Sequence, residues 1–386
     1  MTKQDIRQQI EGYAEIQAEI EVLRKYAHDR RADRGTVDRV INLLHPKELK
    51  LTVSEIIEET ASSKTFRLIS ADGYLPPFQA GQYINIFVNL AGIRSSRPYS
   101  IASSPSQTAY YDVTVRRVED GFVSNYLLDE VTIGNSLTST SPAGLFYYNP
   151  LFHGNNLVFL AGGSGITPFM SMIREVTDRG LDRNITLIYG SRDPDDMIFK
   201  DELEDRAQRH GNFTFIPVIS EPPPSYSGHT GFITAELMQK LLDDVKDRMF
   251  YVCGPEEMYT FCLPELDKLG MPKKRVRQEV FGPPKDITME AGWPSEVKKD
   301  DTFEVQIRGG KTIPARADEP LMISLERAGI TIPTSCRSGE CSLCRTKLLS
   351  GEVFQPRGVK VRKSDRQFGY IHACMAYPLK DLEIML

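Results

Sequence analysis

The sequence lacks an apolar run long enough to span a bilayer, and it lacks any surplus of basic residues. Its 47 Lys and Arg face 52 Asp and Glu, which leaves a net charge of −5. Its N-terminus, MTKQDIRQQIEGYAEI, is charged throughout and has no apolar centre of the kind that signal peptides carry. These absences argue against a membrane span and against a nucleic-acid partner, and they predict a cytoplasmic protein.

Cysteine is scarce and unevenly placed. Cys253 and Cys262 lie mid-chain, whereas the other four crowd into the last fifty or so residues: Cys336, Cys341, Cys344 and Cys374. In a reducing cytosol such a cluster indicates a metal site and not a set of disulfides. The 386 residues are too many for one ordinary core, so we expect two to four domains.

Residues 1–46 are expected to form a helical hairpin that extends from the rest of the chain. In the first helix apolar residues recur every three or four positions, as Ile6, Ile10, Tyr13, Ile16, Ile20 and Leu23. The stretch from His28 to Gly35 breaks this pattern, and Thr36 is expected to cap a second helix that Pro46 stops. The apolar positions of that second helix are Val37, Val40, Ile41 and Leu44.

The rest of the chain changes pattern twice. Short β-like runs such as YINIFVNL predict an antiparallel barrel, and then strand-like and helical runs alternate, which indicates a parallel, doubly wound sheet. The fold class is therefore multidomain α/β plus β. The predicted divisions are a helical extension (1–46), a barrel (48–150), an α/β domain (151–285), a Gly/Pro-rich linker (286–301) and a cysteine-containing domain (302–386).

The strongest motif is the cysteine spacing C-x4-C-x2-C, with Cys374 following after 29 further residues. Three thiolates on one tight loop and one from a distant segment suit a [2Fe–2S] cluster. Small residues let the loop turn its N–H groups toward the sulfurs, and they are Ser335, Ser338, Gly339 and Ser342. The alternatives are a zinc site, which usually uses two C-x2-C pairs, or buried free thiols.

The segment LMISLERAGITIPTSCRSGECSLCRTKLLSGEV, together with IHACMAYPLKDLEI, resembles plant-type ferredoxins over the whole domain. The resemblance implies a β-grasp-like fold with four cluster ligands: Cys336, Cys341, Cys344 and Cys374. That family usually has Gly where this chain has Ser342.

A second motif, Arg97-Pro98-Tyr99-Ser100, resembles the R-x-Y-S flavin motif of the ferredoxin–NADP reductase superfamily. The resemblance implies that Tyr99 stacks on the isoalloxazine, that Ser100 places a hydroxyl near N5, and that Arg97 faces the flavin phosphates. Four letters alone also describe ordinary strand residues. A G-x-x-S follows, in which a helix N-terminus would meet the phosphate: Gly121, Phe122, Val123 and Ser124.

A glycine turn between an apolar strand and a helix matches the superfamily's G-G-x-G-x-T-P nicotinamide motif. Its residues are Gly162, Gly163, Ser164, Gly165, Ile166, Thr167 and Pro168. The later Cys253-Gly254-Pro255 matches that family's C-G-P, where the cysteine faces the nicotinamide. A structural βα turn and a buried structural cysteine are the alternatives.

Three further features depend on this resemblance. Ser191 and Arg192 follow the second strand of the α/β domain, where Arg192 could bind a 2′-phosphate, stack on adenine or lie in solvent. Because the acidic Asp193 comes next, both NADH and NADPH remain possible as the nucleotide that this site binds. Glu279-Val280-Phe281 resembles the superfamily's E-x-F ending, in which Glu279 could relay a proton near the flavin or be an ordinary strand-end residue.

In domain order the chain resembles the reductases of multicomponent oxygenases, and the reductase of hybrid-cluster protein shares that order. The resemblance implies FAD (favoured over FMN by the run RPYSIASSP), a [2Fe–2S] cluster and NADH or NADPH, with single electrons passed to a protein acceptor. That acceptor is an oxygenase component or another redox protein, and the reverse reaction is an alternative. A zinc-containing scaffold without catalysis is the alternative of a different class. We expect residues 1–46 to serve dimerisation or partner docking, or to pack on the chain's own flavin domain.

Overall fold

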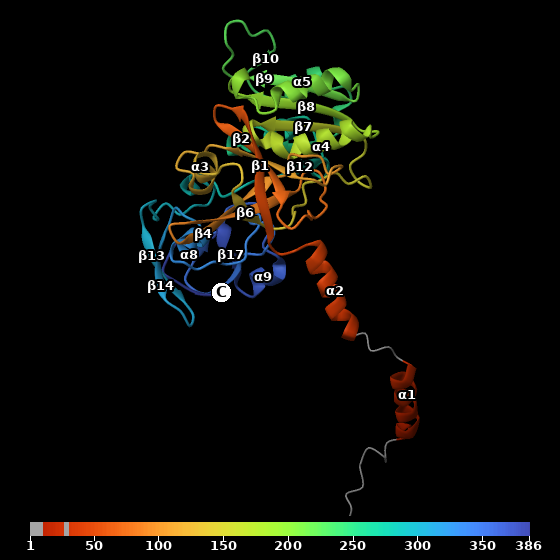
Figure 1. The fold of residues 1–386 in the computed structure, drawn as a ribbon. Coiled ribbons are helices and arrows are strands. Elements are labelled where there is room, and N and C mark those ends of the chain that lie inside the picture. The colour runs from red at the N-terminus through yellow and green to blue at the C-terminus, as the bar shows by residue number, and fades with distance from the viewer. Residues whose placement is uncertain (1–10, 27–30) are drawn as a thin grey trace, which may run out of the picture. The chain divides into compact units, whose positions relative to one another are not determined.

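The computed structural model describes residues 11–26 and 31–386 (Figure 1). It divides into two units, Met1–Lys47 and Glu48–Leu386. Two helices form the first unit, α1 (Tyr13–Tyr26) and α2 (Arg31–Leu44). The expected positions Ile6 and Ile10 lie outside the described residues, and α1 buries none of its own residues.

The predicted start of the second helix is wrong. Thr36 lies inside α2, five residues beyond its first residue, and its hydroxyl accepts a hydrogen bond from Arg39 Nη2 at 3.1 Å instead of capping a helix end. A single Gly35 costs a helix only about 1 kcal/mol, and the preceding Arg, Ala and Asp residues are compatible with helix, so the glycine does not delay the start.

The second unit begins with an antiparallel sheet of six strands in the order β4-β3-β6-β1-β2-β5. An isolated antiparallel bridge joins Ile101, just after β4, to Val113 in β5, so that the two edges of the sheet meet. One helix, α3 (Phe122–Asp129), precedes the last strand. The strands are β1 (Leu49–Thr60), β2 (Ser63–Ser70), β3 (Tyr83–Leu90), β4 (Ile93–Ser100), β5 (Tyr111–Arg116) and β6 (Ser136–Ser139). The predicted antiparallel β-domain is confirmed.

A parallel sheet of six strands follows, in the order β10-β9-β8-β7-β11-β12. Its strands are β7 (Asn156–Gly162), β8 (Asn184–Ser191), β9 (Phe213–Ile219), β10 (His229–Thr230), β11 (Met249–Cys253) and β12 (Val276–Gln278). The chain runs outward from β7 in one direction and returns to β11 on its other side. Ligands of such sheets bind where the order reverses, here between the carboxyl ends of β7 and β11.

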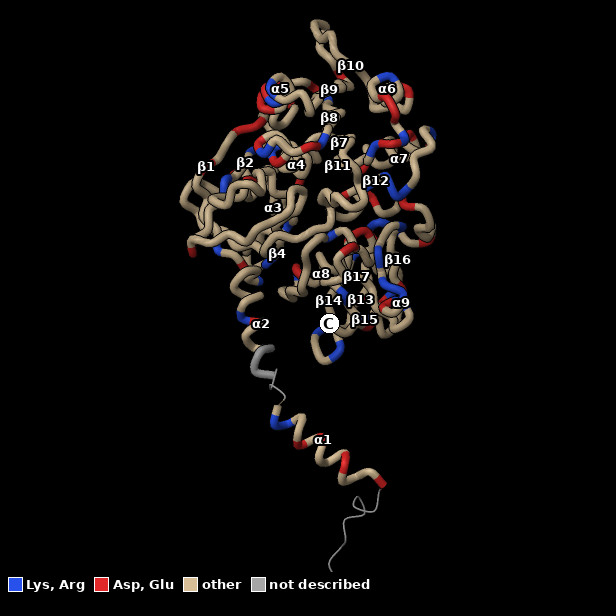
Figure 2. Tube along the Cα trace, turned by 90° about the vertical axis from the view of Figure 1, so that its right-hand side faces the viewer, with Lys and Arg blue, Asp and Glu red and all other residues tan. Residues whose placement is uncertain are grey.

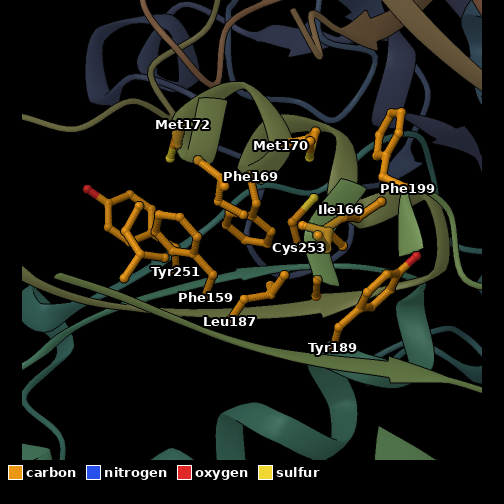
Figure 3. Packing of buried hydrophobic residues seen from close by; sticks show 14 of the residues in the cluster. Phe159, Ile166, Phe169, Met170, Met172, Leu187, Tyr189, Phe199, Tyr251 and Cys253 are labelled. Carbon is orange, nitrogen blue, oxygen red and sulfur yellow. The ribbon is translucent and has the colours of Figure 1, made fainter. Parts of the chain in front are cut away.

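Helices pack on this parallel sheet because their apolar faces match its apolar strands. Figure 3 shows Phe169 of α4 packed toward Phe159 of β7, and the two rings are stacked with their centroids 4.6 Å apart. Gly180, at φ 59°, ends α4 in the left-handed conformation that glycine adopts at little cost. The helices are α4 (Ile166–Arg179), α5 (Lys200–Arg209), α6 (Ala235–Leu241) and α7 (Glu256–Lys268).

The C-terminal part holds a mixed sheet of five strands, β14-β13-β19-β15-β17, in which β13 and β19 are parallel. Its strands are β13 (Thr302–Ile307), β14 (Thr312–Arg316), β15 (Arg345–Ser350), β17 (Tyr370–His372) and β19 (Leu382–Met385), with β16 (Val353–Phe354) and β18 (Tyr377–Pro378) paired beside it. The helices α8 (Leu321–Arg327) and α9 (Lys363–Gln367) complete it. The long segment between α8 and β15 carries three of the four clustered cysteines.

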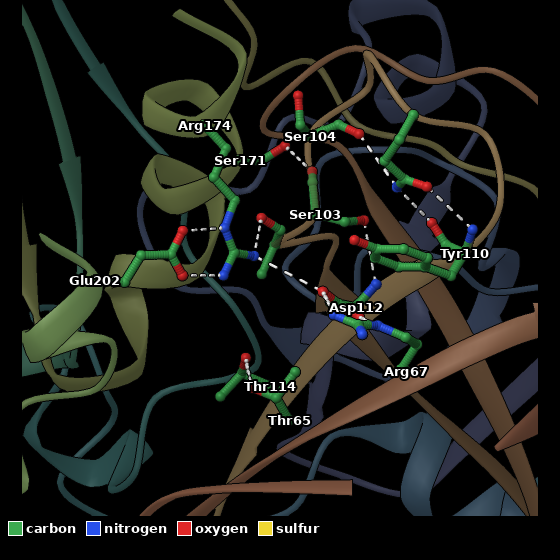
Figure 4. Close-up of polar contacts among 12 residues, drawn as sticks. Thr65, Arg67, Ser103, Ser104, Tyr110, Asp112, Thr114, Ser171, Arg174 and Glu202 are labelled. Atoms are coloured by element: carbon green, nitrogen blue, oxygen red, sulfur yellow. Dashed lines mark hydrogen bonds and ion pairs between the residues drawn. The ribbon is translucent and has the colours of Figure 1, made fainter. Parts of the chain in front are cut away.

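Buried polar contacts join the antiparallel and parallel sheets (Figure 4). Arg174 of α4 forms an ion pair with Glu202 of α5, and its Nη1 donates to the Ala102 carbonyl at 2.9 Å. The same guanidinium lies 3.8 Å from Asp112 of β5, while Ser171 donates to the Ser103 carbonyl at 2.7 Å. These contacts place the end of β4 beside the first turns of α4.

Figure 2 shows Lys and Arg as well as Asp and Glu in many segments of the second unit, and helix α5 (KDELEDRAQR) carries residues of both signs. Within residues 11–26 and 31–386, no helix is both long and apolar enough to cross a membrane.

Candidate functional site

A cleft of about 1770 Å³ opens between the two large sheets and reaches the cysteine-containing domain. Most of the predicted site residues line it: Arg97, Pro98, Tyr99, Ser100, Gly121, Val123, Ser124, Gly162, Gly163, Gly165, Thr167, Ser191, Arg192, Cys253, Gly254, Pro255, Phe281 and Cys374. Pro168, buried in the first turn of α4, and Glu279, which is 6% exposed, do not line the cleft. The same is true of three predicted cluster ligands, Cys336, Cys341 and Cys344. Segments from 97 to 374 are thus brought to one space.

The flavin-motif residues end β4 at the floor of this cleft. The Ser100 hydroxyl is buried and has no hydrogen-bond partner among the described residues, and burial raises the pKa of the Tyr99 hydroxyl. Gly121 caps α3, and a Cβ there would lie 2.2 Å from the Ser124 hydroxyl oxygen. A free hydroxyl, an aromatic ring and a closely approached helix N-terminus suit a flavin and its phosphate.

Two arginines and one carboxylate meet beside this motif. Burial, together with the neighbouring Arg337, lowers the pKa of Arg97 to about 10. Arg337 is paired with Glu326, whereas Arg97 donates only to neutral oxygens of Ser95 and Ser96, at 3.0 and 2.8 Å. Arg97 is partly buried and lines the cleft, and it has no ion pair with a carboxylate of the described residues, so it favours an anionic ligand such as the flavin phosphates.

The nicotinamide motif is built on close backbone approach. A Cβ at Gly165 would lie 2.2 Å from the carbonyl oxygen of Cys253, and one at Gly162 would lie 2.7 Å from Met258 Sδ. Gly163 has φ 51°, in the left-handed region. Glycine therefore lets the turn after β7 contact the turn after β11, at the point where the strand order reverses. Such a turn can cradle a pyrophosphate.

Cys253 and Glu279 are both buried next to Tyr259. The Tyr259 hydroxyl donates to the Glu279 carbonyl and accepts from the Gly254 N–H at 3.1 Å. Burial, with Glu279 nearby, raises the pKa of Cys253 well above its usual value. Burial, with Glu340 nearby, likewise raises the pKa of Glu279, whose Oε2 has no partner among the described residues. Burial disfavours the charged carboxylate, and a carboxyl in such a position can hold and deliver a proton.

The adenine end of the cleft is open. The Arg192 side chain is 77% exposed and lies 3.6 Å from Glu221. Asp193 turns away, because its carboxylate accepts from the Asp195 N–H at 2.8 Å and caps a short 3-10 helix. Arg192, whose ion pair with Glu221 is an exposed one, is therefore the side chain of these two that could reach a ribose substituent.

The four clustered cysteines converge. The thiol of Cys336 contacts those of Cys341 and Cys374, and the Cys344 thiol contacts Cys374. Among the described residues no three His, Cys, Asp or Glu side chains are arranged as ligands of a single ion. The thiol contacts run from Cys341 through Cys336 and Cys374 to Cys344, and four thiols brought together in this way fit a two-iron cluster.

The loop between the first two cysteines turns its backbone inward, as expected. Cys336 Sγ accepts from three N–H groups, those of Ser338, Glu340 and Cys341, at 3.3–3.4 Å. Ser342 has φ 60°, a conformation that costs a side chain about 1–2 kcal/mol and costs glycine little. This conformation explains why glycine is the usual residue of plant-type ferredoxins at that position.

Sequence reasoning missed several residues of the cleft. Arg116 of β5 lines it next to Gly163 and pairs with Asp196, and Tyr259 joins the two ends of the nicotinamide site. Neither residue belongs to a motif. Arg337 lies within the cysteine motif, but the spacing of the cysteines does not indicate which residues Arg337 contacts.

Fold and site together define a flavin- and nicotinamide-dependent oxidoreductase with an iron–sulfur domain attached. Three family models match the chain in order: Oxidoreductase FAD-binding domain (residues 48–148), Oxidoreductase NAD-binding domain (159–263) and 2Fe-2S iron-sulfur cluster binding domain (305–379). The chain belongs to the ferredoxin–NADP reductase-type reductases that carry FAD and a C-terminal plant-type [2Fe–2S] domain.

The glycine betaine monooxygenase reductase subunit of Pseudomonas aeruginosa is 30% identical over 343 residues, covering 86% of this chain and 93% of that protein. The NADH oxidoreductase HCR of Escherichia coli is 29% identical, covering 86% and 96%. Among solved structures, phthalate dioxygenase reductase is similar at a TM-score of 0.65 with 25% identity, covering 88% and 97%. The chain is therefore an NAD(P)H-dependent oxidoreductase, which removes the scaffold alternative.

Proposed function

We propose that this chain is the reductase component of a multicomponent oxygenase and delivers single electrons through its cluster to the oxygenase protein. The supporting observation is the single cleft that reaches the nicotinamide motif, the flavin motif and Cys374. Bound FAD accepts two electrons as hydride, and a [2Fe–2S] cluster passes electrons one at a time. The relative from P. aeruginosa and the solved phthalate dioxygenase reductase are both reductases of oxygenases by name.

In this proposal the chain's own residues position and protect the reacting groups. Tyr99 would stack on the flavin ring, the Ser100 hydroxyl, unpartnered among the described residues, would donate to it, and Arg97 would bind its phosphates. Cys253 would pack against the nicotinamide, and the Glu279 carboxyl could hold a proton for the reduced flavin. The cluster ligands are Cys336, Cys341, Cys344 and Cys374. The domain divisions after residues 46, 150, 285 and 301 belong to the same proposal.

Replacing Tyr99 tests the flavin site. Tyr99→Ala should weaken FAD binding about tenfold, because a stacking surface worth roughly 0.5–1.5 kcal/mol beyond burial is lost together with that burial. Tyr99→Phe keeps the ring and should bind FAD like the wild type. Fluorescence titration of apoprotein with FAD measures both, and equal affinity of all three proteins would contradict the role.

Arg192 tests nucleotide preference. Arg192→Ala should lower the NADPH-to-NADH ratio of kcat/KM by about tenfold or more, since a charged hydrogen bond is worth about 1.5–3 kcal/mol. The matched control is Arg209→Ala, because Arg209 is an exposed arginine of α5 that pairs with Asp205. This variant should leave kcat/KM unchanged with both NADPH and NADH. A ratio that Arg192→Ala leaves unaltered would show that this residue does not read the 2′-phosphate.

The acceptor would approach the cluster where it is nearest to solvent. Leu343 lies between Cys341 and Cys344 and is 52% exposed, and an exposed apolar side chain of this kind suits a protein partner. The proposed function is tested by mixing the reduced protein with the oxygenase component encoded beside its gene. Reoxidation of the cluster by that component is expected, and its absence at saturating partner would contradict the proposal.

A non-oxygenase acceptor is the alternative. The similar E. coli protein supports it, because its name, NADH oxidoreductase HCR, mentions no oxygenase. The same mixing experiment distinguishes the two, because an unrelated redox protein would then reoxidise the cluster. Formation of NAD(P)H from reduced cluster would identify the reverse direction. A cytoplasmic location suits either acceptor, since cluster thiols persist in a reducing compartment.

We also propose that residues 1–46 serve dimerisation or partner docking. Apolar side chains of α1 and α2 are about half exposed, including Leu23 (58%) and Ile41 (52%), and a short isolated helix is marginal in water. Deleting residues 1–46 should leave dye reduction by NAD(P)H intact and change the oligomeric state or the rate of partner reduction. Light scattering and dye assays measure both, and loss of bound flavin would contradict this assignment.

A further inference from the structure

The cluster loop is fixed to the flavin barrel by a buried ion pair. Arg337, the residue after the first cluster cysteine, pairs with Glu326 of α8, and their side chains are 6% and 8% exposed. Arg337 has φ 52°, so its backbone adopts the left-handed conformation that non-glycine residues rarely take. A strained, buried and charged residue in a cluster loop has a cost that its contacts must offset.

Those contacts cross to the barrel. Ser95 Oγ of β4 donates to Glu326 Oε2 at 3.0 Å, and Arg337 Nη2 lies 3.5 and 3.4 Å from the hydroxyls of Ser95 and Ser96. Asn85 of β3 adds a hydrogen bond from its Nδ2 to the Thr334 carbonyl at 3.3 Å. The barrel residues of this contact are nine-tenths or more buried.

The same contact reaches the flavin motif. The Ser95 hydroxyl that donates to Glu326 also accepts from Arg97 Nη1 at 3.0 Å. Beside it, the Tyr83 hydroxyl lies 3.1 Å from the Ser335 hydroxyl, next to the first cluster cysteine. One short set of hydrogen bonds thus connects the arginine assigned to the flavin phosphates with the loop that holds the cluster.

We infer that Arg337 and Glu326 are positioning residues for electron transfer from flavin to cluster, and that they hold the ferredoxin domain fixed on the barrel during turnover. Separating the domains would break the hydrogen bonds that join Ser95, Ser96 and Asn85 of the barrel to the ferredoxin domain, so these contacts favour the docked arrangement. The acceptor therefore comes to the docked cluster, and the cluster does not swing out to the acceptor. This inference rests on the FAD-to-cluster route of the reductase.

Two variants separate docking from stability of the ferredoxin loop itself. Ser95→Ala with Ser96→Ala removes the barrel hydroxyls that contact the Arg337–Glu326 pair and leaves the pair intact, whereas Arg337→Gln removes the pair. Ser54→Ala, on an exposed position of β1, and Arg308→Gln, on the far ion pair with Glu383, are the controls. Iron content and the visible spectrum establish that each variant retains its cluster.

Rapid mixing with NADH at saturating FAD should show unchanged flavin reduction and a flavin-to-cluster step about tenfold slower or more in both interface variants, since small misplacements cost on the order of 10²-fold. Limited proteolysis should cut the linker (286–301) faster in the same variants, and the controls should match the wild type. Unchanged transfer and cleavage in Ser95→Ala/Ser96→Ala would overturn the inference, even if Arg337→Gln is slow. Linker cleavage is measured without substrate, so it tests docking even if the acceptor proposal fails.

Discussion

Replacing Cys374 by Ser is expected to abolish the [2Fe–2S] cluster and to leave reduction of the flavin by NAD(P)H intact. Cys374 lies in a 3-10 helix after β17, is 3% exposed and contacts the thiols of Cys336 and Cys344. In the proposed ligand set it is the one ligand that does not come from the cluster loop, so its loss would leave one iron without a ligand. Iron should fall from about two per chain toward zero, as measured by chemical analysis and the visible spectrum.

Cys262→Ser is the matched control for this experiment. Cys262 is equally buried, but it lies in α7 and matches no motif. It should keep both the iron and the spectrum. An intact cluster in the Cys374→Ser protein would show that another residue is the fourth ligand, and iron loss in the control would point to general instability.

Gly165→Val should lower the rate of flavin reduction by NAD(P)H at least 100-fold. A Cβ at this position would lie 2.2 Å from the Cys253 carbonyl oxygen and 2.6 Å from the Gly254 Cα, so the two nicotinamide turns must move apart. Displacements of about 1 Å cost on the order of 10²-fold in rate. Stopped-flow absorbance with NADH and NADPH measures the effect.

Dithionite is the control reductant, because it reduces the flavin and the cluster directly and does not need the nicotinamide site. Both centres should respond normally in Gly165→Val, with full flavin and iron content. Gly211→Val is the control, since no atom lies within 4 Å of a Cβ at that turn. Normal NAD(P)H reduction in Gly165→Val would contradict the assigned site, and loss of flavin would indicate damage beyond it.

Much of the fold could be predicted because local patterns encode it. Alternating apolar residues in runs such as YINIFVNL predict strands, and the glycine turn between β7 and α4 marks the first βα unit. The error at the second helix has a local cause as well. Gly35 followed by Thr36 resembles the start of a helix in sequence, but one glycine is too weak a signal to set that start, and α2 begins at Arg31.

The candidate site likewise contains residues that local sequence identifies and residues that only the tertiary structure brings together. Cysteine spacing and the R-x-Y-S and C-G-P motifs identify residues whose chemistry depends on near neighbours in sequence. Arg174 with Asp112, or Arg337 with Ser95, could not be paired in this way. Those partners lie 62 and 242 positions apart in the sequence, and each pair contains ordinary residues with many other potential partners.

The sequence by itself determined the three cofactor motifs, their order and the class of chemistry, because each motif is a short run whose backbone needs dictate its residue types. Only the tertiary structure decided that the motifs face one cleft, that Glu279 is buried with an unpartnered oxygen, and that the cluster loop is fixed to β4 through Arg337 and Glu326. The physical reason is that burial and ion pairing depend on which distant segments pack together. That packing follows from the summed apolar surfaces of whole domains and not from any local pattern.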